Sequence, residues 1–488
     1  MKSKNKLFLF LFSTALVFIA TGFSSKFTAY AKTYYVSPNG FDCNWSQATS
    51  DTGSIDKPLK TLKNAVCNYM KPGDTLIVRG GTYHERLDIY KQGTPTSQFT
   101  IKNYPNETVT LYADGDATEM GNGIVFHDNA CYWNISGLNI TNYTGSGVWL
   151  DGEGTSSNVN HINLNNLNIY GINGPLTGNY GTEGIFANAN VSYCTIQNCK
   201  IHDISLPANR TDRDHGIYIG YGVSHIIIDG NEIYNNVGSG IQFYGSSNGH
   251  NGASYCTISN NKIYNNHAYG LTIFTSSEHN SVYRNSFYGN KIYDLRIHDS
   301  SNNNVFKNNL FGSINSDYNV DMENNSDNNT FNNNCYAKSD SKVVYAHNLC
   351  MDFNIWQSKY SEDLGGNKLT TASRTNDVLN AQNTEISKRL QFSNFNQTTN
   401  FVSSSKTWSI NFNNTIDKAS LNSNTVWVED ALGNIFSTSL QLSDDQKTIV
   451  VSPNKNYTNN TMYCLYINNL TSTSGKVLTP LKMSFLTY

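Results

Sequence analysis

A short sequence unit recurs through the middle of this chain at intervals of 24 residues or somewhat more. Its copies open at Gly123, Gly147, Gly184, Gly216, Gly240, Gly270 and Asp294, and each continues as a short alternating strand. A second strand with an internal asparagine follows in each copy, as at Asn231, Asn261 and Asn285. Short alternating strands joined by Asn/Gly turns, repeated at this length, are typical of a parallel β-helix. The repeat therefore predicts an all-β fold in which each coil buries its inner face against the next.

Four turns of the repeat are longer than the others. Two carry about eight extra residues in consecutive coils, at 171–183 and 204–215, and two shorter insertions lie at 151–161 and 245–255. Insertions in solenoids gather on one face, often the binding face. Because stacked coils are about 4.8 Å apart, the two long insertions should lie side by side.

The first residues read as a secretory signal. A basic start is followed by an apolar run from Leu7 to Phe23 and by Ala29-Tyr30-Ala31, an Ala-x-Ala cleavage site. The alternative is a membrane anchor. No other stretch approaches the roughly 18 apolar residues that a span needs. We expect residues 1–31 to be removed and the mature protein to be extracellular, without a membrane span.

Charge and cysteine content limit the classes of partner. Loss of residues 1–31 removes four lysines and no acids, which moves the formal net charge from −3 to −7. So acidic a chain is a poor generic nucleic-acid binder, and it would meet an anionic glycan only through local Arg/Lys clusters. The nine cysteines form no Cys-x-x-Cys pair that would indicate zinc, and Cys194 and Cys256 are expected to fill the core.

The N-terminal segment resembles a known superfamily. The segments 34–40, 57–62, 73–78 and 81–85 resemble, in sequence and spacing, the opening of secreted right-handed β-helix proteins of the pectate-lyase-like superfamily. With the coils behind it, the resemblance implies a right-handed β-helix with an N-terminal cap over residues 32–356. The resemblance implies the reaction only weakly, because proteins with this fold include lyases, epimerases, hydrolases and catalytically inactive spikes.

The C-terminal part has a different pattern. Residues 357–400 are rich in Ser, Thr, Asn and Gln and are predicted to be a linker. From 401 to 488, alternating strands with turns every 8 to 12 residues predict a small β-sandwich. The runs 411–417, 442–448 and 485–487 resemble bacterial Ig-like modules of the S-layer type, which usually space or anchor. The resemblance leaves cell-wall association as one option. Separately, we expect the protein to be a monomer.

Strand alternation predicts an outward row on the opening strands. If Ile185, Ile217 and Ile241 point inward, the next residue in each strand points outward. The row then reads Val125, Trp149, Phe186, Tyr218, Gln242, Thr272 and Arg296. Sugar rings stack on exposed aromatic rings, so we predict that Trp149, Phe186 and Tyr218 bind the substrate. We add the nearby Tyr244 and the cation Arg296 from the same row to the predicted substrate-binding residues. In the alternative, the inserted loops cover these rings as a satellite core.

The densest ionisable cluster ends the second long insertion. It reads Arg210-Thr211-Asp212-Arg213-Asp214-His215, and Glu183 holds the position of His215 one coil earlier. A carboxylate beside a histidine can fix its tautomer and raise its basicity, and arginines attract an anionic substrate. The alternative is that these charges only tie a long loop to the barrel.

This cluster suits β-elimination on a uronate polymer. That reaction needs a base for the proton next to the carboxylate, a cation that neutralises the carboxylate, and an acid for the leaving oxygen. We predict His215 as the base, oriented by Glu183 or Asp214, Tyr218 as the acid, and Arg210 and Arg213 as the neutralising cations. The protein is thus expected to be a polysaccharide lyase with an acidic polysaccharide as its partner.

Alternatives to this reading remain open. The cluster resembles, at a distance, the Asp-x-His site of β-helix alginate lyases and mannuronan epimerases. It departs from that pattern because position 213 is Arg and the acid, Asp214, is adjacent to His215. Calcium, which many of these relatives use, would have Asp212 and Asp214 as its candidate ligands. Uronate epimerisation, glycoside hydrolysis by Glu183 with Asp212 or Asp214, and non-catalytic glycan binding at the cell surface are the other functions.

One further row is interpreted as structural. Asn231, Asn261, Asn285, Asn308 and Asn333 recur once per coil in the second strand or its turn. Stacked amides in a turn hydrogen-bond their neighbours, so we expect this row to stabilise the helix.

Overall fold

The computed structural model describes most of the chain from residue 31 onward. The described ranges are 31–114, 121–154, 157–174, 181–205, 213–245, 252–338, 342–360, 362–369, 392–394, 400–430, 434–459 and 461–487, with residues 380, 383 and 384. The predicted signal peptide, apart from Ala31, lies outside them. No helix in the described part of the chain has the length and apolar character that a membrane crossing requires.

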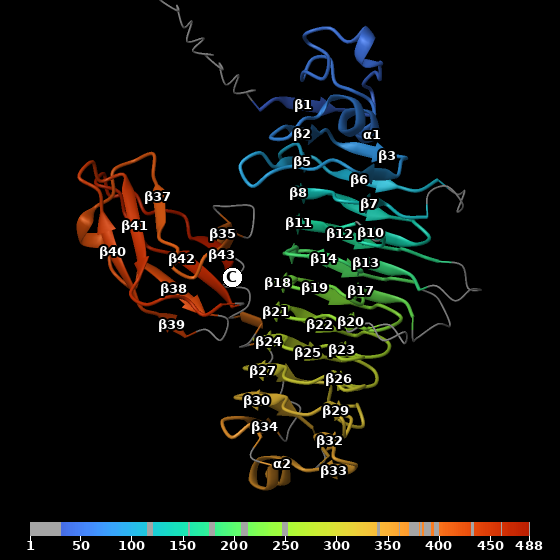
Figure 1. Ribbon diagram of the computed structural model, residues 1–488, viewed down its shortest axis with the longest axis vertical. Coiled ribbons are helices and arrows are strands. Elements are labelled where there is room, and N and C mark those ends of the chain that lie inside the picture. Colours follow the sequence, from blue (N-terminus) through green and yellow to red (C-terminus); the bar gives the residue numbers. More distant parts are fainter. Residues whose placement is uncertain are drawn as a thin grey trace, which may run out of the picture. The chain divides into compact units, whose positions relative to one another are not determined.

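Three long parallel sheets, here called A, B and C, form the predicted β-helix (Figure 1). Successive strands of the chain enter the sheets in turn, so each coil adds one strand to each sheet. Sheet C contains, in order of stacking, β4 (Leu87–Ile89), β7 (Ile124–Phe126), β10 (Ser146–Asp151), β13 (Glu183–Asn188), β17 (His215–Ile219), β20 (Ile241–Phe243), β23 (Leu271–Ile273), β26 (Leu295–Ile297), β29 (Val320–Met322), β32 (Val344–Ala346) and the antiparallel β33 (Leu349–Met351).

Sheets A and B have the same stacking order. Sheet A contains β1 (Thr33–Val36), β2 (Thr75–Val78), β5 (Phe99–Asn103), β8 (Cys131–Ser136), β11 (Val159–Asn165), β15 (Thr195–Gln197), β18 (Ile227–Asp229), β21 (Thr257–Ser259), β24 (Ser281–Tyr283), β27 (Val305–Lys307) and β30 (Thr330–Asn332), with β14 (Val191–Ser192) beside β11. Sheet B contains β3 (Gly81–Tyr83), β6 (Val109–Tyr112), β9 (Asn139–Thr141), β12 (Asn168–Tyr170), β16 (Lys200–His202), β19 (Glu232–Tyr234), β22 (Lys262–Tyr264), β25 (Ser286–Tyr288), β28 (Leu310–Phe311), β31 (Cys335–Ala337) and β34 (Asn367–Leu369).

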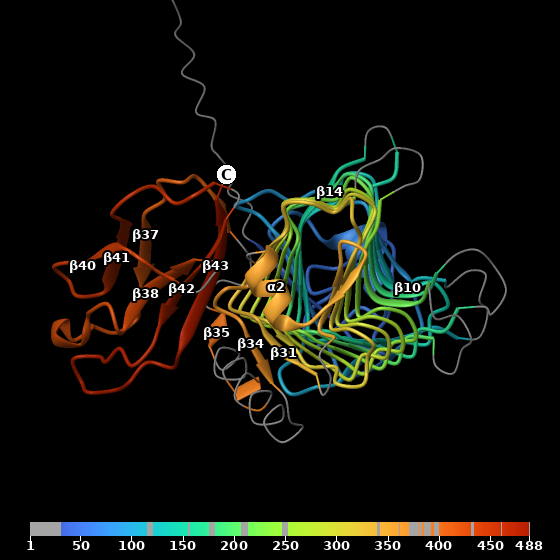
Figure 2. The same cartoon turned by 90° about the horizontal axis from the view of Figure 1, so that it is seen from below.

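The core lies inside the coils, which are seen end-on in Figure 2. Ile185, Ile217 and Ile241 stack in register on neighbouring strands of sheet C, and all three are fully buried. The predicted inward positions are thus confirmed. β-Branched and aromatic side chains pack well on this pleated, buried surface. The apolar face of each coil is shielded from water only when the neighbouring coils are stacked on it.

Asparagine ladders stabilise the turns. Nδ2 of Asn231 donates to Oδ1 of Asn261 at 2.9 Å, and Asn261 donates in the same way to Asn285. The structure corrects the predicted row at its far end. The ladder continues through the buried Asn309 and Asn334, whereas Asn308 and Asn333 adopt left-handed backbone conformations just before them. Asn is one of the few residues that take this conformation readily, which explains the doubled asparagines.

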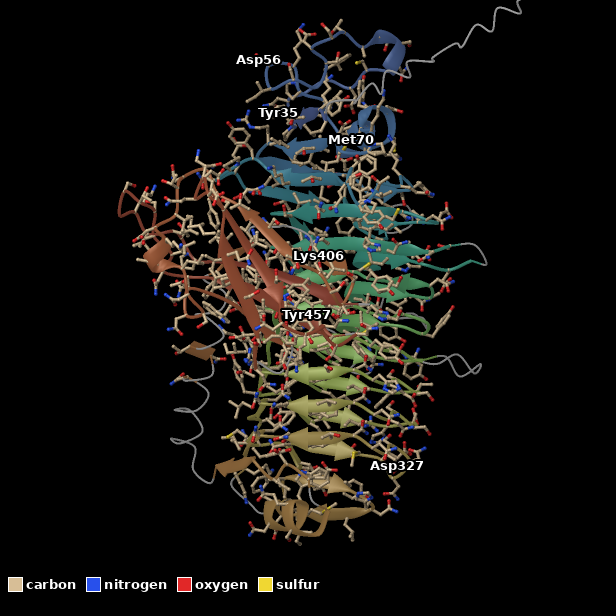
Figure 3. The ribbon with its side chains drawn as sticks, turned by 60° about the vertical axis from the view of Figure 1, so that its left-hand side comes forward. Tyr35, Asp56, Met70, Asp327, Lys406 and Tyr457 are labelled. Atoms are coloured by element: carbon tan, nitrogen blue, oxygen red, sulfur yellow. The ribbon has the colours of Figure 1, made fainter. Side chains whose placement is uncertain are left out.

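Both ends of the helix are covered. At the start, α1 (Leu62–Asn64) continues as η2 (Ala65–Tyr69). The buried residues of η2 and Met70, which follows it and is labelled in Figure 3, belong to the main core. Upstream lies the short η1 (Trp45–Gln47). At the far end, α2 (Phe353–Tyr360) places the fully buried Trp356 edge-on against Phe331, with ring centroids 5.4 Å apart. Beyond the predicted boundary at 356, β34 pairs with β31, so the sheets extend into the predicted linker.

The C-terminal region is a two-sheet sandwich. One sheet contains β35 (Ser393–Asn394), β36 (Asn400–Val402), β38 (Val426–Asp430), β39 (Ile435–Phe436), β42 (Met462–Ile467) and β43 (Leu481–Thr487). The other contains β37 (Trp408–Asn411), β40 (Thr438–Leu442) and β41 (Thr448–Pro453), and η3 (Lys418–Ser420) lies between β37 and β38. Val426, Val428, Leu465 and Phe485 form its buried centre.

Candidate functional site

The inserted turns all border sheet C. The insertions at 171–183 and 204–215 lead into β13 and β17, and those at 151–161 and 245–255 follow β10 and β20. The ends of the two long insertions that the structure describes lie side by side, because the amide of Thr182 donates to Oδ1 of Asp214 at 2.9 Å. The candidate functional site is therefore on the outer face of sheet C.

A row of three aromatic side chains runs along this face. Trp149 pairs with Phe186 and Phe186 with Tyr218 in the parallel register, as the strand alternation predicts. The ring centroids of Trp149 and Phe186 are 5.8 Å apart, and those of Phe186 and Tyr218 are 5.2 Å apart. All three residues are half-buried. Their partial exposure fits both the platform reading and the reading in which loops complete a small core.

Glu183 and His215 begin neighbouring strands and are directly paired in sheet C. Glu183 is 8% exposed, and its Oε2 accepts a hydrogen bond from the hydroxyl of Ser146 at 3.0 Å. Two glycines make room for the pair. A Cβ on Gly181 would lie 2.2 Å from the backbone oxygen of Arg213 and 2.5 Å from Oε1 of Glu183, and one on Gly238 would lie 2.7 Å from Nδ1 of His215.

The imidazole of His215 is held in one tautomer. It is 2% exposed, and its Nδ1 accepts the backbone N–H of Ser239 at 3.0 Å. The neutral ring therefore carries its proton on Nε2. Burial lowers the pKa of His215 to about 3, so the ring is neutral at ordinary pH. In this state the side chain offers a hydrogen-bond donor and no lone pair to a ligand.

Tyr218 is a phenol that stays protonated. Burial, followed by the charges of Glu183 and Tyr244, raises the pKa of Tyr218 above its usual value. Its ring lies 5.7 Å from that of His215, and Tyr244 in turn lies edge-on to Phe274 at 6.3 Å. The structure thus brings together Glu183, His215, Tyr218 and Tyr244.

The rest of the predicted charge cluster divides in three ways. Arg210 and Asp212 lie outside the described residues. Arg213 is exposed at the end of the second long insertion. Asp214 is fully buried, with its carboxylate on the amide of Thr182, so it faces the interior and not a ligand in this structure. Among the described residues, no group of three His, Cys, Asp or Glu side chains could hold a metal ion.

Arg296, the last member of the predicted row, lies in a second ionic cluster. Its guanidinium is within 5.1 Å of the Tyr269 ring and 5.0 Å of the Phe274 ring, and Nη1 donates to the Tyr269 hydroxyl at 2.9 Å. Oδ2 of Asp321 forms an ion pair with Nε of Arg296 at 3.3 Å and lies 2.9 Å from Nε2 of His298. The cation is therefore largely engaged by the protein.

A third cluster, at the N-terminal end of the same face, escaped the sequence analysis. Nε2 of His127 lies 2.7 Å from Oδ1 of Asp88, which also accepts two hydrogen bonds from Arg86. Burial by itself would raise the pKa of Asp88, but the hydrogen bonds from His127 and Arg86 outweigh it and lower the pKa. Tyr90, 54% exposed, stacks on His127 at 4.6 Å. His127 follows the first glycine-led strand, but Arg86, Asp88 and Tyr90 come from the preceding coil, which lacks the glycine that opens the other copies.

Sheet B carries an aromatic column of its own. One ring per coil stacks with its plane nearly parallel to the next, in the order Tyr170, His202, Tyr234, Tyr264 and Tyr288. A hollow of about 490 Å³ beside it is lined by Asn139, Asn168 and His202 among others. These groups bond to one another: Asn168 donates to Asn139 at 3.2 Å and accepts from His202 at 3.1 Å. Because their polar atoms are already paired, sheet C remains the candidate site.

Comparison with known families agrees with the fold. Residues 34–205 match the family model described as "Pel9A-like, right handed beta helix region", and residues 183–355 match "Right handed beta helix region". Residues 391–487 match the model of a bacterial Ig-like domain. Together the first two models span the coils that carry sheets A, B and C.

Individual proteins are more distant. An uncharacterized protein of Bacillus subtilis (strain 168), YwoF, is 33% identical over 150 residues, which is 28% of each chain. Among solved structures, pectate lyase Pel9A aligns with a TM-score of 0.45 at 16% identity, covering 65% of this chain and 78% of its own. The GH136 lacto-N-biosidase of Eubacterium ramulus aligns with a TM-score of 0.47 at 14% identity, covering 69% and 67%.

Proposed function

Because this chain is a right-handed parallel β-helix protein of the pectate-lyase-like type with a C-terminal bacterial Ig-like domain, we propose that it is a secreted polysaccharide lyase. Its substrate is an acidic, uronate-containing polysaccharide that it cleaves by β-elimination on the outer face of sheet C. The observation that carries this proposal is the grouping of Trp149, Phe186 and Tyr218 with Glu183 and the exposed Arg213, on the face that all the inserted turns border.

Substrate binding rests on the aromatic row. Stacking of sugar rings on Trp149, Phe186 and Tyr218 supplies binding along the coil axis, in the direction that a linear polymer would follow. Arg213 supplies a positive charge that attracts the uronate carboxylate. This charge stabilises the transition state more than the ground state, because negative charge on the carboxylate grows as enolate character develops. An overall acidic chain needs such a local cation to hold an anionic glycan.

The base in this proposal is Glu183 in place of His215. A useful general base has a pKa near the working pH and a free lone pair. His215 has a pKa of about 3, and its Nδ1 is occupied by the Ser239 amide. The neighbouring carboxylate of Glu183 accepts a hydrogen bond from the Ser146 hydroxyl, and its register pairing with His215 fixes its place. His215 then acts as a positioning residue that packs beneath the site.

Tyr218 is the acid in this proposal. A phenol whose pKa is raised stays protonated and can give its proton to the leaving glycosidic oxygen. The charge of Glu183 contributes to that rise, and the two residues lie on the paired strands β13 and β17. Epimerisation would use the same proton abstraction without loss of the leaving group.

Hydrolysis finds less support. It needs two carboxylates about 5 to 9.5 Å apart across the sugar, both facing it. Of the candidate partners for Glu183, Asp214 is fully buried and bonded to the Thr182 amide. Non-catalytic glycan binding would need only the aromatic row, and it is the outcome to expect if no bond is cleaved.

Product analysis tests the proposed function. Mass spectrometry of oligouronates after incubation should show a new fragment that is lighter by one water than the hydrolysis product, because elimination leaves an unsaturated end. A sugar of altered stereochemistry at unchanged mass would instead identify an epimerase. Fragments of hydrolytic mass would refute β-elimination, and unchanged substrate would leave binding as the function.

A further inference from the structure

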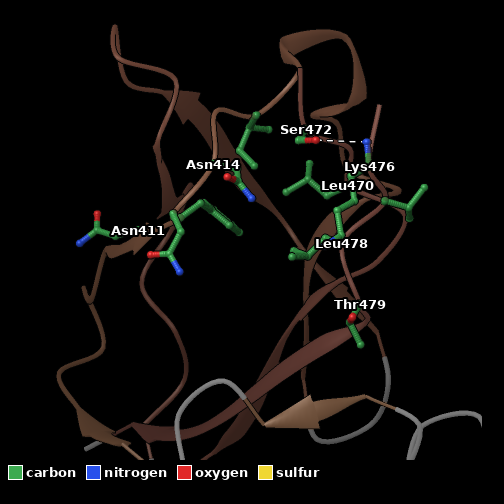
Figure 4. A pocket seen from close by; sticks show the side chains of 11 residues that line it. Asn411, Asn414, Leu470, Ser472, Lys476, Leu478 and Thr479 are labelled. Atoms are coloured by element: carbon green, nitrogen blue, oxygen red, sulfur yellow. Dashed lines mark hydrogen bonds between the residues drawn. The ribbon is translucent and has the colours of Figure 1, made fainter. Parts of the chain in front are cut away.

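The Ig-like sandwich contains a cavity at one end, between the segments 411–416 and 470–479 (Figure 4). Its volume is about 290 Å³. The isolated bridge between Ile416 and Ser472 joins the two segments, and the Lys476 amide donates to the Ser472 hydroxyl at 3.1 Å. Ligand pockets usually hold roughly 300 to 1,000 Å³, so this one suits a single sugar residue.

One wall of the cavity is made of amides. Asn411 and Asn414 lie on this side in Figure 4, and Asn413 lies between them in the chain. Oδ1 of Asn411 accepts from the Thr448 hydroxyl at 2.9 Å. Within the part of the chain that the structure describes, the exposed side chains of Asn413 and Asn414 make no hydrogen bond. Each offers a donor and an acceptor, which is what sugar hydroxyls require.

The other wall is apolar with a cation at its rim. Leu470 is fully buried, Leu478 packs on the sandwich core, and Val477 is 55% exposed. Phe412 provides a half-buried ring on the amide-bearing segment. Lys476 lines the same cavity, is exposed, and pairs with no carboxylate among the described residues. An apolar wall, a ring, free amides and an ammonium group together fit a sugar that carries a carboxylate.

We propose that the Ig-like domain binds one uronate residue of an acidic polysaccharide in this cavity, and so holds the polymer independently of the candidate active site. The choice of a uronate among sugars rests on the proposed function. The presence of a sugar site rests on the cavity, the unpaired amides and Lys476. A domain that would otherwise only space or anchor thereby gains a binding role.

Retention of the full-length chain in a native gel containing polygalacturonate, with and without substitution, tests this proposal. The background is Glu183→Gln, so that cleavage does not deplete the polymer. Lys476→Gln and Asn414→Ala should each weaken retention about tenfold or more, the usual worth of hydrogen bonds to a charged group. Lys455→Gln, an exposed lysine of the same domain that does not line the cavity, should leave retention unchanged.

Three controls make the result decisive. Thermal melting should show that each variant is folded. With Glu183 restored, turnover of a short soluble oligouronate should be the same in Lys476→Gln and in the parent, since the candidate active site is untouched. Retention needs no catalysis, so it stays readable even if the chain cleaves nothing. Equal retention of the parent, Lys476→Gln and Asn414→Ala would overturn the proposal, and equal retention of the parent on a neutral polymer would overturn its uronate class.

Discussion

Glu183 and His215 are paired across adjacent strands of sheet C, and the imidazole is locked by the Ser239 amide while the carboxylate is held by the Ser146 hydroxyl. The two residues occupy the same position one coil apart but have different roles. The buried His215 ring packs beneath the site, and the Glu183 carboxylate beside it is the better candidate for proton abstraction.

Substituting each member of this pair should separate chemistry from packing. Glu183→Gln should lower turnover by about 10² to 10⁴, the usual contribution of a positioned acid–base group, with little change in substrate affinity. His215→Gln should lower thermal stability and affect turnover less. Initial rates and melting temperatures of both variants check this. A reversed order, with His215→Gln the more damaging to turnover at equal stability, would return the base to His215.

Tyr218→Phe isolates the phenolic proton. The ring and its contact with Phe186 remain, so glycan binding should be nearly unchanged, while turnover should fall by about 10² to 10⁴. Binding measured by calorimetry and turnover measured separately give the two quantities. As a matched control, Tyr264→Phe in the sheet B column should change neither. Loss of binding without loss of turnover would argue against an acid role.

Trp149→Ala tests the aromatic platform. Loss of one stacking ring should weaken binding of an acidic oligosaccharide by about 1–3 kcal/mol. Tyr234→Ala, in the ring column of sheet B, serves as the control and should leave affinity unchanged. If Trp149→Ala lowers the free energy of unfolding and leaves affinity intact, the row is a satellite core and the platform is refuted.

The pH dependence of stability reports the burial of His215. Its pKa is about 3 in the folded state and about 6.5 when unfolded, so between these values the unfolded chain binds a proton that the folded chain does not. The stabilisation is complete above pH 6.5 and is lost as pH falls towards 3. His161, with a pKa lowered to about 4, contributes in the same direction. His215→Gln should flatten this slope, which urea titrations at a series of pH values measure.

The asparagine ladder gives a test that requires no substrate. Asn309→Ala should cost about 1–3 kcal/mol for each group left unpaired, because Asn309 donates to the Val282 carbonyl and to Asn334 and accepts from Asn285. Asn308→Gly, at a left-handed position that glycine tolerates, should cost far less. Equal losses of unfolding free energy would show that the ladder contributes little.

The coils were predictable because their signals are local and repeated. Strand alternation placed Ile217 inward and Tyr218 outward, and the spacing placed the insertions beside sheet C. The site was predictable only in part. Whether His215 is exposed depends on Gly238 and Ser239 one coil later, and the pairing of His127 with Asp88 depends on how the preceding, irregular coil stacks on the first repeat. Such contacts are set by stacking, and no periodicity in one sequence reveals them.

Ultraviolet absorbance of unsaturated ends, followed while the chain lacking residues 1–31 is incubated with a panel of uronate polymers, tests the central claim most directly. The proposed function predicts a steady rise with at least one polymer, and a rate reduced about 10² to 10⁴-fold in both Glu183→Gln and Tyr218→Phe. No rise with any polymer, or a rise that both variants retain in full, would contradict the account.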